Sequence, residues 1–251
     1  MTREQCLFLA KKMYVELVYN TAYIEGVNIT FPQTQTIIDG GVVNNVAVSD
    51  IQTVLNLRDA WKFILDSVDA PLNLEYVCKV NEYVSRNESL EWGKLRNGNV
   101  CVSGTDYIPE LPEINKVRAA LEQINAITDP TEQAMEYFCY AVHAQLFWDG
   151  NKRTSTMIAS KILMQNSIGV LTIDAKNSLA FNEGLHHFYN TGDKKLLISA
   201  LKGCIKTLDI QPELNKSKRI SDRLKEKKVE CDRLNSERSI TKIIPDKDRG
   251  R

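Results

Sequence analysis

The sequence of 251 residues lacks any apolar stretch close to the roughly 20 residues that a membrane-spanning helix needs. It also lacks a cleavable leader pattern at its start, so we expect neither secretion nor membrane insertion. The absence of formal net charge gives no electrostatic reason to expect nucleic acid or a membrane as the main partner. The six cysteines lie far apart in the sequence, which argues against a zinc cluster, a redox dithiol or a disulfide framework. A cytoplasmic location fits these absences best.

What the sequence does contain is enough apolar residues, at 43%, to form one sizeable core or two small ones. Their spacing is mostly helical. The predicted helices are Arg3–Thr21, Asp50–Val68, Asn73–Ser85, Pro112–Ile127, Thr131–Phe147, a segment reaching Leu163, Ser178–Phe188 and Lys194–Leu208. Turn residues at 97–99 and 104–106 predict a hairpin between Leu95 and Ile108. The sequence therefore predicts an all-α domain that carries a single β-hairpin.

The composition shifts near Pro212. From there to Arg251 there are 13 Lys and Arg residues against 8 Asp and Glu residues. We expect three parts, namely residues 1–45, a core of residues 46–211, and a basic tail of residues 212–251 that is partly helical or disordered. A basic tail is more often a solvated appendage than a grip on nucleic acid, so nucleic-acid binding ranks lowest among the functions considered.

The segment DGNKR at residues 149–153 directly precedes apolar residues at helical spacing. Free backbone N–H groups and the dipole at a helix start attract an anion, and Lys152 and Arg153 add positive charge. Asp149 would repel a bare phosphate but would suit a magnesium ion shared with phosphate oxygens. The segment therefore predicts a cradle for a di- or triphosphate without the GxxxxGK[ST] pattern. An ordinary turn between two helices is an equally good interpretation of these residues alone.

These residues resemble the signature of the Fic family, HxFx(D/E)GN(G/K)RxxR. The matching positions are Phe147, Asp149, Gly150, Asn151, Lys152 and Arg153. Three further segments resemble family motifs in the same order along the chain. They are Thr21–Gly26, similar to the (S/T)xxxE(G/N) inhibitory motif; Gly93–Arg96 with the following VCVSGTDYIP, similar to GxxR and the flap; and Asn190–Asp193, similar to NxGD. The resemblance covers about residues 18–205.

The resemblance implies a Fic-type helical domain with a hairpin flap, which transfers AMP from ATP, with Mg²⁺, to a hydroxyl side chain of an unidentified protein target. A smaller branch containing Doc, which also carries Lys after the Asn, transfers phosphate instead. The oligomeric state stays open, with a homodimer as one alternative.

Roles for individual residues are also implied by the resemblance. Asp149 would hold magnesium, and Phe147 would anchor the loop in the core. The phosphates would be bound by Gly150, Asn151, Lys152 and Arg153. The adenine pocket would include Asn190, and Glu25 would be inhibitory. The flap residues that align the target side chain would be Val102, Gly104 and Tyr107.

Two residues depart from the family pattern. Gln145 stands where the family has its general base, a histidine, and an amide does not accept that proton at neutral pH. Loss of a positioned base typically costs about 10²- to 10⁴-fold in rate. His143 would face the opposite side of a continuous helix, because two residues correspond to about 200° of rotation. A catalytically silent module that binds nucleotide or a partner is therefore an alternative function.

The second departure is Thr156, which stands where the family has the arginine that the inhibitory glutamate captures. Without that arginine, Glu25 could pair with Arg153 or Lys152. Autoinhibition through Glu25 and an exposed acid at a helix end are then equally good interpretations.

Overall fold

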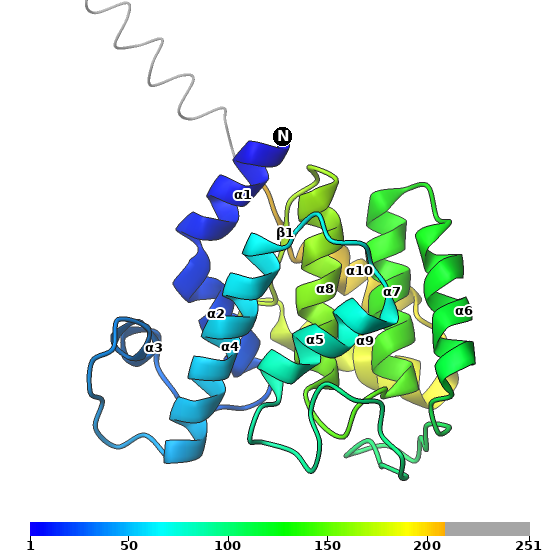
Figure 1. The fold of residues 1–251 in the computed structure, drawn as a ribbon, viewed down its shortest axis with the longest axis horizontal. Coiled ribbons are helices and arrows are strands. Elements are labelled where there is room, and N and C mark those ends of the chain that lie inside the picture. The colour runs from blue at the N-terminus through cyan, green and yellow to red at the C-terminus, as the bar shows by residue number, and fades with distance from the viewer. Residues whose placement is uncertain (209–251) are drawn as a thin grey trace, which may run out of the picture. The chain divides into compact units, whose positions relative to one another are not determined.

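Helix α8 (Asn151–Gln165) lies at the centre of the fold, and almost all of its side chains are buried. In the computed structural model, which describes residues 1–208, α8 packs against α7 (Pro130–Ala144), α5 (Leu74–Val84) and α4 (Val48–Asp66) (Figure 1). A helix that is surrounded in this way has little freedom to move. Its N-terminal end, which carries the DGNKR segment, is therefore held in a fixed place.

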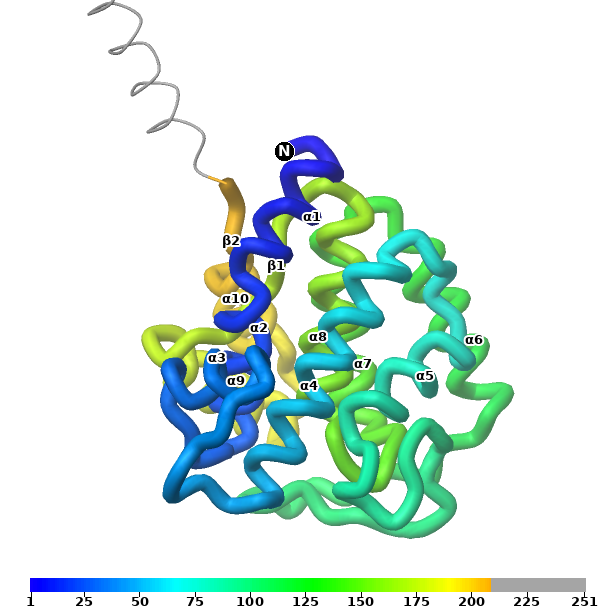
Figure 2. The backbone as a smooth tube through the Cα atoms, turned by 60° about the vertical axis from the view of Figure 1, so that its left-hand side comes forward, coloured from blue at the N-terminus to red at the C-terminus, as the bar shows by residue number. Residues whose placement is uncertain are grey.

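The other elements surround this centre. They are α1 (Arg3–Lys12), α2 (Tyr14–Tyr23), α3 (Phe31–Ile38), α6 (Ile114–Asn125), α9 (Ser178–Thr191) and α10 (Lys195–Gly203) (Figure 2). The one sheet of residues 1–208 pairs β1 (Val170–Leu171) with β2 (Ile205–Lys206) in antiparallel register, with Val170 opposite Lys206. The prediction of a mostly helical domain is confirmed. The predicted tail at residues 212–251 lies outside the described residues, and the predicted boundaries at 45 and 211 stay predictions.

Several element boundaries differ from the sequence prediction for local reasons. The helix expected at Arg3–Thr21 is two helices that meet at Met13, whose backbone (φ −90°, ψ 9°) is not helical. The helix expected to reach Phe147 ends at Ala144, because Gln145 adopts a left-handed conformation with φ 46°. The last predicted helix ends at Gly203 and is followed by β2.

Helix α3 was not predicted, and a capping box begins it. The Thr30 side chain accepts from the Gln33 N–H, and the Gln33 side chain accepts from the Thr30 N–H. The reciprocal bonds satisfy two backbone donors that a helix start leaves free. This short signal was present in the sequence.

The flap at residues 95–108 is a loop with a turn, and it contains no strand. The Thr105 N–H donates to the Val102 carbonyl at 3.2 Å, so the turn forms where the sequence predicted it. The carbonyls near both ends of the flap accept from the buried guanidinium of Arg96, which reaches Gly98 at 2.6 Å and Glu110 at 2.5 Å. A side chain thus takes the place of the cross-strand hydrogen bonds that a hairpin would supply.

No helix among residues 1–208 is long and apolar enough to cross a membrane.

Lys161 is a fully buried cation in the middle of α8. Its Nζ donates to the Ala70 carbonyl and to Gln165 Oε1, and it lies 5.2 Å from the centre of the Tyr76 ring. Burial lowers the pKa of Lys161 to about 8, against an opposing influence of Asp69. Between pH 8 and about 10 the folded chain therefore loses this proton while the unfolded chain retains it.

We expect the unfolding free energy of the wild type to rise by about 1 to 2 kcal/mol relative to Lys161→Met between pH 8 and about 10. The sign follows because the unfolded state binds more protons in this window, so higher pH favours the folded state. Urea unfolding of the wild type and of Lys161→Met at several pH values measures the difference between their unfolding free energies. The titration of groups that both proteins share cancels in this difference. Parallel pH curves for the two variants would contradict the prediction.

Candidate functional site

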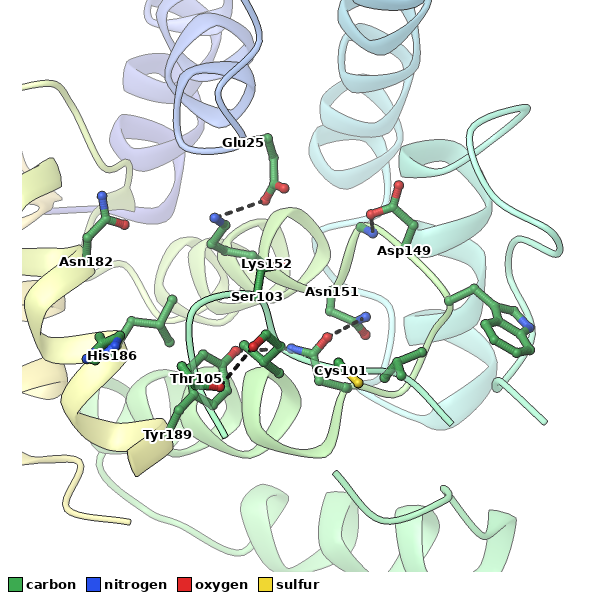
Figure 3. A pocket seen from close by; sticks show the side chains of 16 residues that line it. Glu25, Cys101, Ser103, Thr105, Asp149, Asn151, Lys152, Asn182, His186 and Tyr189 are labelled. Carbon is green, nitrogen blue, oxygen red and sulfur yellow. Dashed lines mark hydrogen bonds and ion pairs between the residues drawn. The ribbon is translucent and has the colours of Figure 1, made fainter. Parts of the chain in front are cut away.

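A cavity of about 410 Å³ opens at the N-terminal end of α8. Five parts of the chain line it: Glu25 just after α2, the flap, the loop between α7 and α8, the first residues of α8, and helix α9 (Figure 3). We call it the α8 cavity. Its lining residues that matter below are Glu25, Val102, Gln145, Asp149, Lys152 and His186.

Gly150 forces the loop to turn sharply into α8. Its backbone is left-handed, with φ +72°, and a Cβ at this position would lie 2.3 Å from Ser85 Oγ. The side chains of Asn81 and Ser85 each donate to the Asp149 carbonyl at 3.0 Å, so α5 and its end hold the loop from behind. Helix α8 has no side-chain cap at its N-terminus. Its first backbone N–H groups therefore remain available to an anion in the cavity.

Asn151 closes the loop on itself. Its Oδ1 accepts from the Phe147 N–H at 2.9 Å, and its Nδ2 donates to the Phe147 carbonyl at 2.8 Å. Phe147 is buried in the core, at 2% exposure. The side chain of Asn151 thus fixes the shape of the loop, although the residue also lines the α8 cavity.

Gln145 lines the α8 cavity, and its amide is bonded at both ends. Nε2 donates to the Val142 carbonyl at 2.7 Å and to the Tyr189 hydroxyl at 3.1 Å. Oε1 accepts from Asn151 Nδ2 at 3.1 Å. The residue at the position of the family's base is therefore tied into the protein and offers no basic nitrogen to a hydroxyl.

His143 lines a different cavity from Gln145, although the continuous helix on which that prediction depended ends at Ala144. Its Nδ1 lies 2.8 Å from the Tyr107 hydroxyl, and burial lowers the pKa of its imidazole. Tyr107, which was predicted to serve in the flap, also lines that second cavity. Neither side chain lines the α8 cavity.

Lys152 supplies the positive charge of the α8 cavity. Its Nζ donates to the Ile24 carbonyl at 2.8 Å and lies 3.6 Å from Glu25 Oε1 (Figure 3). That Glu25 oxygen is buried and has no hydrogen-bond partner among the described residues. Of the two partners considered for Glu25, the structure places Lys152 in contact with it.

Arg153 does not line the α8 cavity. Its side chain is only 4% exposed, with Nη1 2.7 Å from Glu88 Oε2 and Nη2 3.3 Å from Asp149 Oδ2. Burial alone would lower the pKa of Arg153, but the carboxylates of Glu25, Glu88 and Asp149 outweigh it and raise this pKa above the usual value. The predicted phosphate-binding role of Arg153 therefore needs a different orientation from the one observed.

Helix α9 contacts the turn of the flap. His186 Nε2 lies 2.9 Å from the Gly104 carbonyl, and Asn190 Nδ2 lies 3.1 Å from His186 Nδ1. Gly104 has φ +78°, which suits the turn. Asn190, predicted to line an adenine pocket, lies outside the α8 cavity in another depression of the surface that it shares with His186.

Sequence reasoning missed three residues that shape this site. Arg96 belongs to the GxxR segment, but its contacts with the flap could not be inferred from the sequence. Glu88 and Tyr189 lie outside the segments that resemble family motifs, and no sequence signal indicates their roles. Each acts through a partner that is distant along the chain, as with the bond from Gln145 to Tyr189.

The residues of the α8 cavity fit a magnesium ion only if it is shared with a ligand. Asp149 is half-exposed, and its Oδ1 accepts from the Gly150 N–H at 2.6 Å. Within residues 1–208, no three His, Cys, Asp or Glu side chains gather where they could hold a metal. Magnesium usually takes one or two protein carboxylates together with substrate phosphates, so a single aspartate suits it when phosphate is also bound.

Comparison with known proteins agrees with the family resemblance of the middle of the chain. Residues 71–163, which include α5, the flap, the loop and most of α8, match the model of the Fic/DOC family. Residues 71–163 form a Fic/DOC family domain. The mostly helical fold is shared with solved structures of Fic proteins.

Two such structures cover most of the chain. Fic-1 of Caenorhabditis elegans (residues 134–508) superposes with a TM-score of 0.68 at 21% identity, over 76% of this chain and 60% of that one. A Fic domain containing signaling protein from Bacteroides thetaiotaomicron also gives a TM-score of 0.68, at 17% identity, over 81% of this chain and 87% of that one.

Among curated proteins, most of the chain aligns with proteins named as adenylyltransferases. Protein adenylyltransferase Fic of Drosophila persimilis is 25% identical over 214 residues, which are 80% of this chain and 41% of the relative. Protein adenylyltransferase fic-1 of Caenorhabditis briggsae is 23% identical over 197 residues, which are 74% of this chain and 38% of the relative. The chain thus spans less than half the length of these relatives.

Proposed function

We propose that this chain transfers AMP from ATP to a hydroxyl side chain of a protein, at a low rate. One observation carries the proposal: the uncapped N-terminus of α8, the ammonium of Lys152 and the flap face the same cavity. A helix N-terminus with an adjacent cation suits a nucleotide phosphate. The names of the curated relatives support adenylyl transfer as the reaction.

Each residue then has a defined task. The backbone N–H groups at the start of α8 and Lys152 bind phosphate oxygens. Asp149 would hold magnesium, which when bound would supply Lewis-acid stabilisation of the charge that develops on phosphate. Asn151 keeps the loop in shape through its bonds to Phe147. The flap lies across the cavity and orients the target chain.

Gln145 favours a second candidate, a silent module that binds nucleotide without turning it over. Its amide is engaged by Val142, Tyr189 and Asn151, so no group at this position takes the proton from the acceptor hydroxyl. Binding of nucleotide is common to both candidates, whereas transfer belongs to the first alone.

Nucleotide binding tests what both candidates share. In calorimetry with ATP and Mg²⁺, Asp149→Ala is expected to weaken binding by about tenfold, because the metal loses its protein carboxylate. Glu25→Gln is expected to tighten binding by a few-fold, because it removes the negative charge that faces Lys152. Label transfer from ATP to proteins of a lysate, present in the wild type and lost in Asp149→Ala, then separates the transferase from the silent module.

The two variants are expected to change the affinity for ATP in opposite directions, so each serves as a control for the other. If the wild type binds no nucleotide, both candidates fail. If it binds nucleotide but labels no protein above the level of Asp149→Ala, the silent module replaces the transferase.

A further inference from the structure

A second acidic residue, distinct from Glu25, pairs with a cation at the start of α8 that does not line the α8 cavity. Glu88 follows α5 and is 14% exposed, and its Oε2 lies 2.7 Å from Arg153 Nη1. Arg153 follows Lys152 directly, yet only Lys152 lines the cavity. The same guanidinium also contacts the Val84 carbonyl and Asp149. The structure thus pairs an arginine at the start of α8 with protein carboxylates.

Glu88 is itself held in place by neutral groups. Its Oε1 accepts from Asn56 Nδ2 at 2.7 Å, and its backbone N–H donates to the Ser85 carbonyl at 3.0 Å. Asn56 is anchored in turn by a 2.7 Å bond to the Arg86 carbonyl. Glu88 therefore presents a pre-oriented carboxylate to Arg153, and little conformational entropy is lost when the pair forms.

The pair leaves the guanidinium with an unused donor. Arg153 Nε is buried and has no hydrogen-bond partner. Three carboxylates, those of Glu25, Glu88 and Asp149, surround two cations, Lys152 and Arg153, at this end of α8. The local charge is therefore negative by one unit, which opposes a triphosphate more strongly than a monophosphate.

We propose that Glu88 is a positioning residue that sets the nucleotide selectivity of the α8 cavity by holding Arg153 out of it. This inference rests on the proposed function, because it assumes that the cavity binds an adenine nucleotide. While Glu88 is bound to Arg153, only Lys152 and the helix N-terminus bind phosphate. Loss of the Glu88 charge frees the guanidinium to reach the outer phosphates, which a monophosphate lacks.

The test compares affinities for ATP and AMP, each with Mg²⁺, in wild type and Glu88→Gln. The glutamine keeps the size of the side chain and an acceptor for Asn56. We expect Glu88→Gln to tighten ATP binding by about tenfold and to leave AMP binding within about twofold. In an Arg153→Met background, the same substitution should leave the ratio of the two affinities unchanged, because the cation through which Glu88 acts is absent.

A purely structural role for Glu88 predicts a different result, in which both affinities fall together with thermal stability. Equal effects on ATP and AMP, or a selectivity change that persists in Arg153→Met, would overturn the inference. A wild type that binds neither nucleotide counts against the proposed function. When the wild type binds neither nucleotide, the inference is supported if the Glu88→Gln variant binds ATP. It fails if that variant binds no ATP either.

Discussion

Replacing Gln145 by histidine is expected to raise the rate of AMP transfer by about 10²- to 10⁴-fold. The reason is that the surrounding loop is already shaped for a base. The Val142 carbonyl, which now accepts from the Gln145 amide at 2.7 Å, can accept from imidazole Nδ1–H instead. That bond leaves Nε2 unprotonated toward the cavity, where it can take the proton from a hydroxyl. Incorporation of label from ATP into protein, followed over time, measures the gain.

Two matched variants control this experiment. Gln145→Ala removes the amide without supplying a base and should give no gain. Asp149→Ala combined with Gln145→His should lose the gain, because the metal then lacks its protein carboxylate. If Gln145→His binds ATP as tightly as the wild type but transfers no more label, the machinery lacks more than its base, and the silent module is favoured.

Arg96→Met is expected to lower the free energy of unfolding by about 3 to 5 kcal/mol. Arg96 is only 1% exposed. Its guanidinium donates to four backbone carbonyls, those of Gln145 at 2.6 Å, Gly98 at 2.6 Å, Glu110 at 2.5 Å and Pro109 at 3.3 Å. Methionine fills a similar volume but leaves these carbonyls without their donor. Each orphaned buried acceptor costs about 1 to 3 kcal/mol, partly offset because the desolvated cation is also removed.

Urea unfolding followed by circular dichroism measures this loss. Arg118→Met provides the control, since Arg118 pairs with Glu75 on the surface at 2.7 Å and an exposed ion pair contributes little to stability. A loss for Arg96→Met no larger than that of the control would show that water replaces the guanidinium. Because Arg96 also joins the flap to the Gln145 carbonyl, nucleotide binding should weaken even under conditions where the variant stays folded.

Much of the fold was predictable because its helices carry strong local signals. The apolar spacing in Asp50–Val68 and Asn73–Ser85 predicted α4 and α5 to within two residues at each end. The break at Met13 was not predictable, because the apolar pattern continues through it. The flap is a loop because Arg96 replaces the ladder bonds, and a long-range contact of this kind leaves no periodic pattern in the sequence.

The site was predictable in outline for a similar reason. Gly150 and Asp149 lie where a motif at a helix start must place them, and both line the α8 cavity. The orientation of Arg153 was not predictable, because Glu88 is 65 residues away in the sequence. The position of Asn190 outside the cavity depends likewise on its bond to His186, which in turn contacts the flap.

The paired bonds between the Asn151 side chain and the Phe147 backbone fix the shape of the loop. They join the backbone of residue 147 to a side chain four residues later, and neither bond uses the acid at 149. The side chain at 145 accepts a separate bond from the same Asn151 amide nitrogen. Under the proposed function, a substitution at position 145 changes turnover, while these two bonds to the backbone keep the loop in shape. Nucleotide binding and its turnover would then be separable by a single amino-acid replacement.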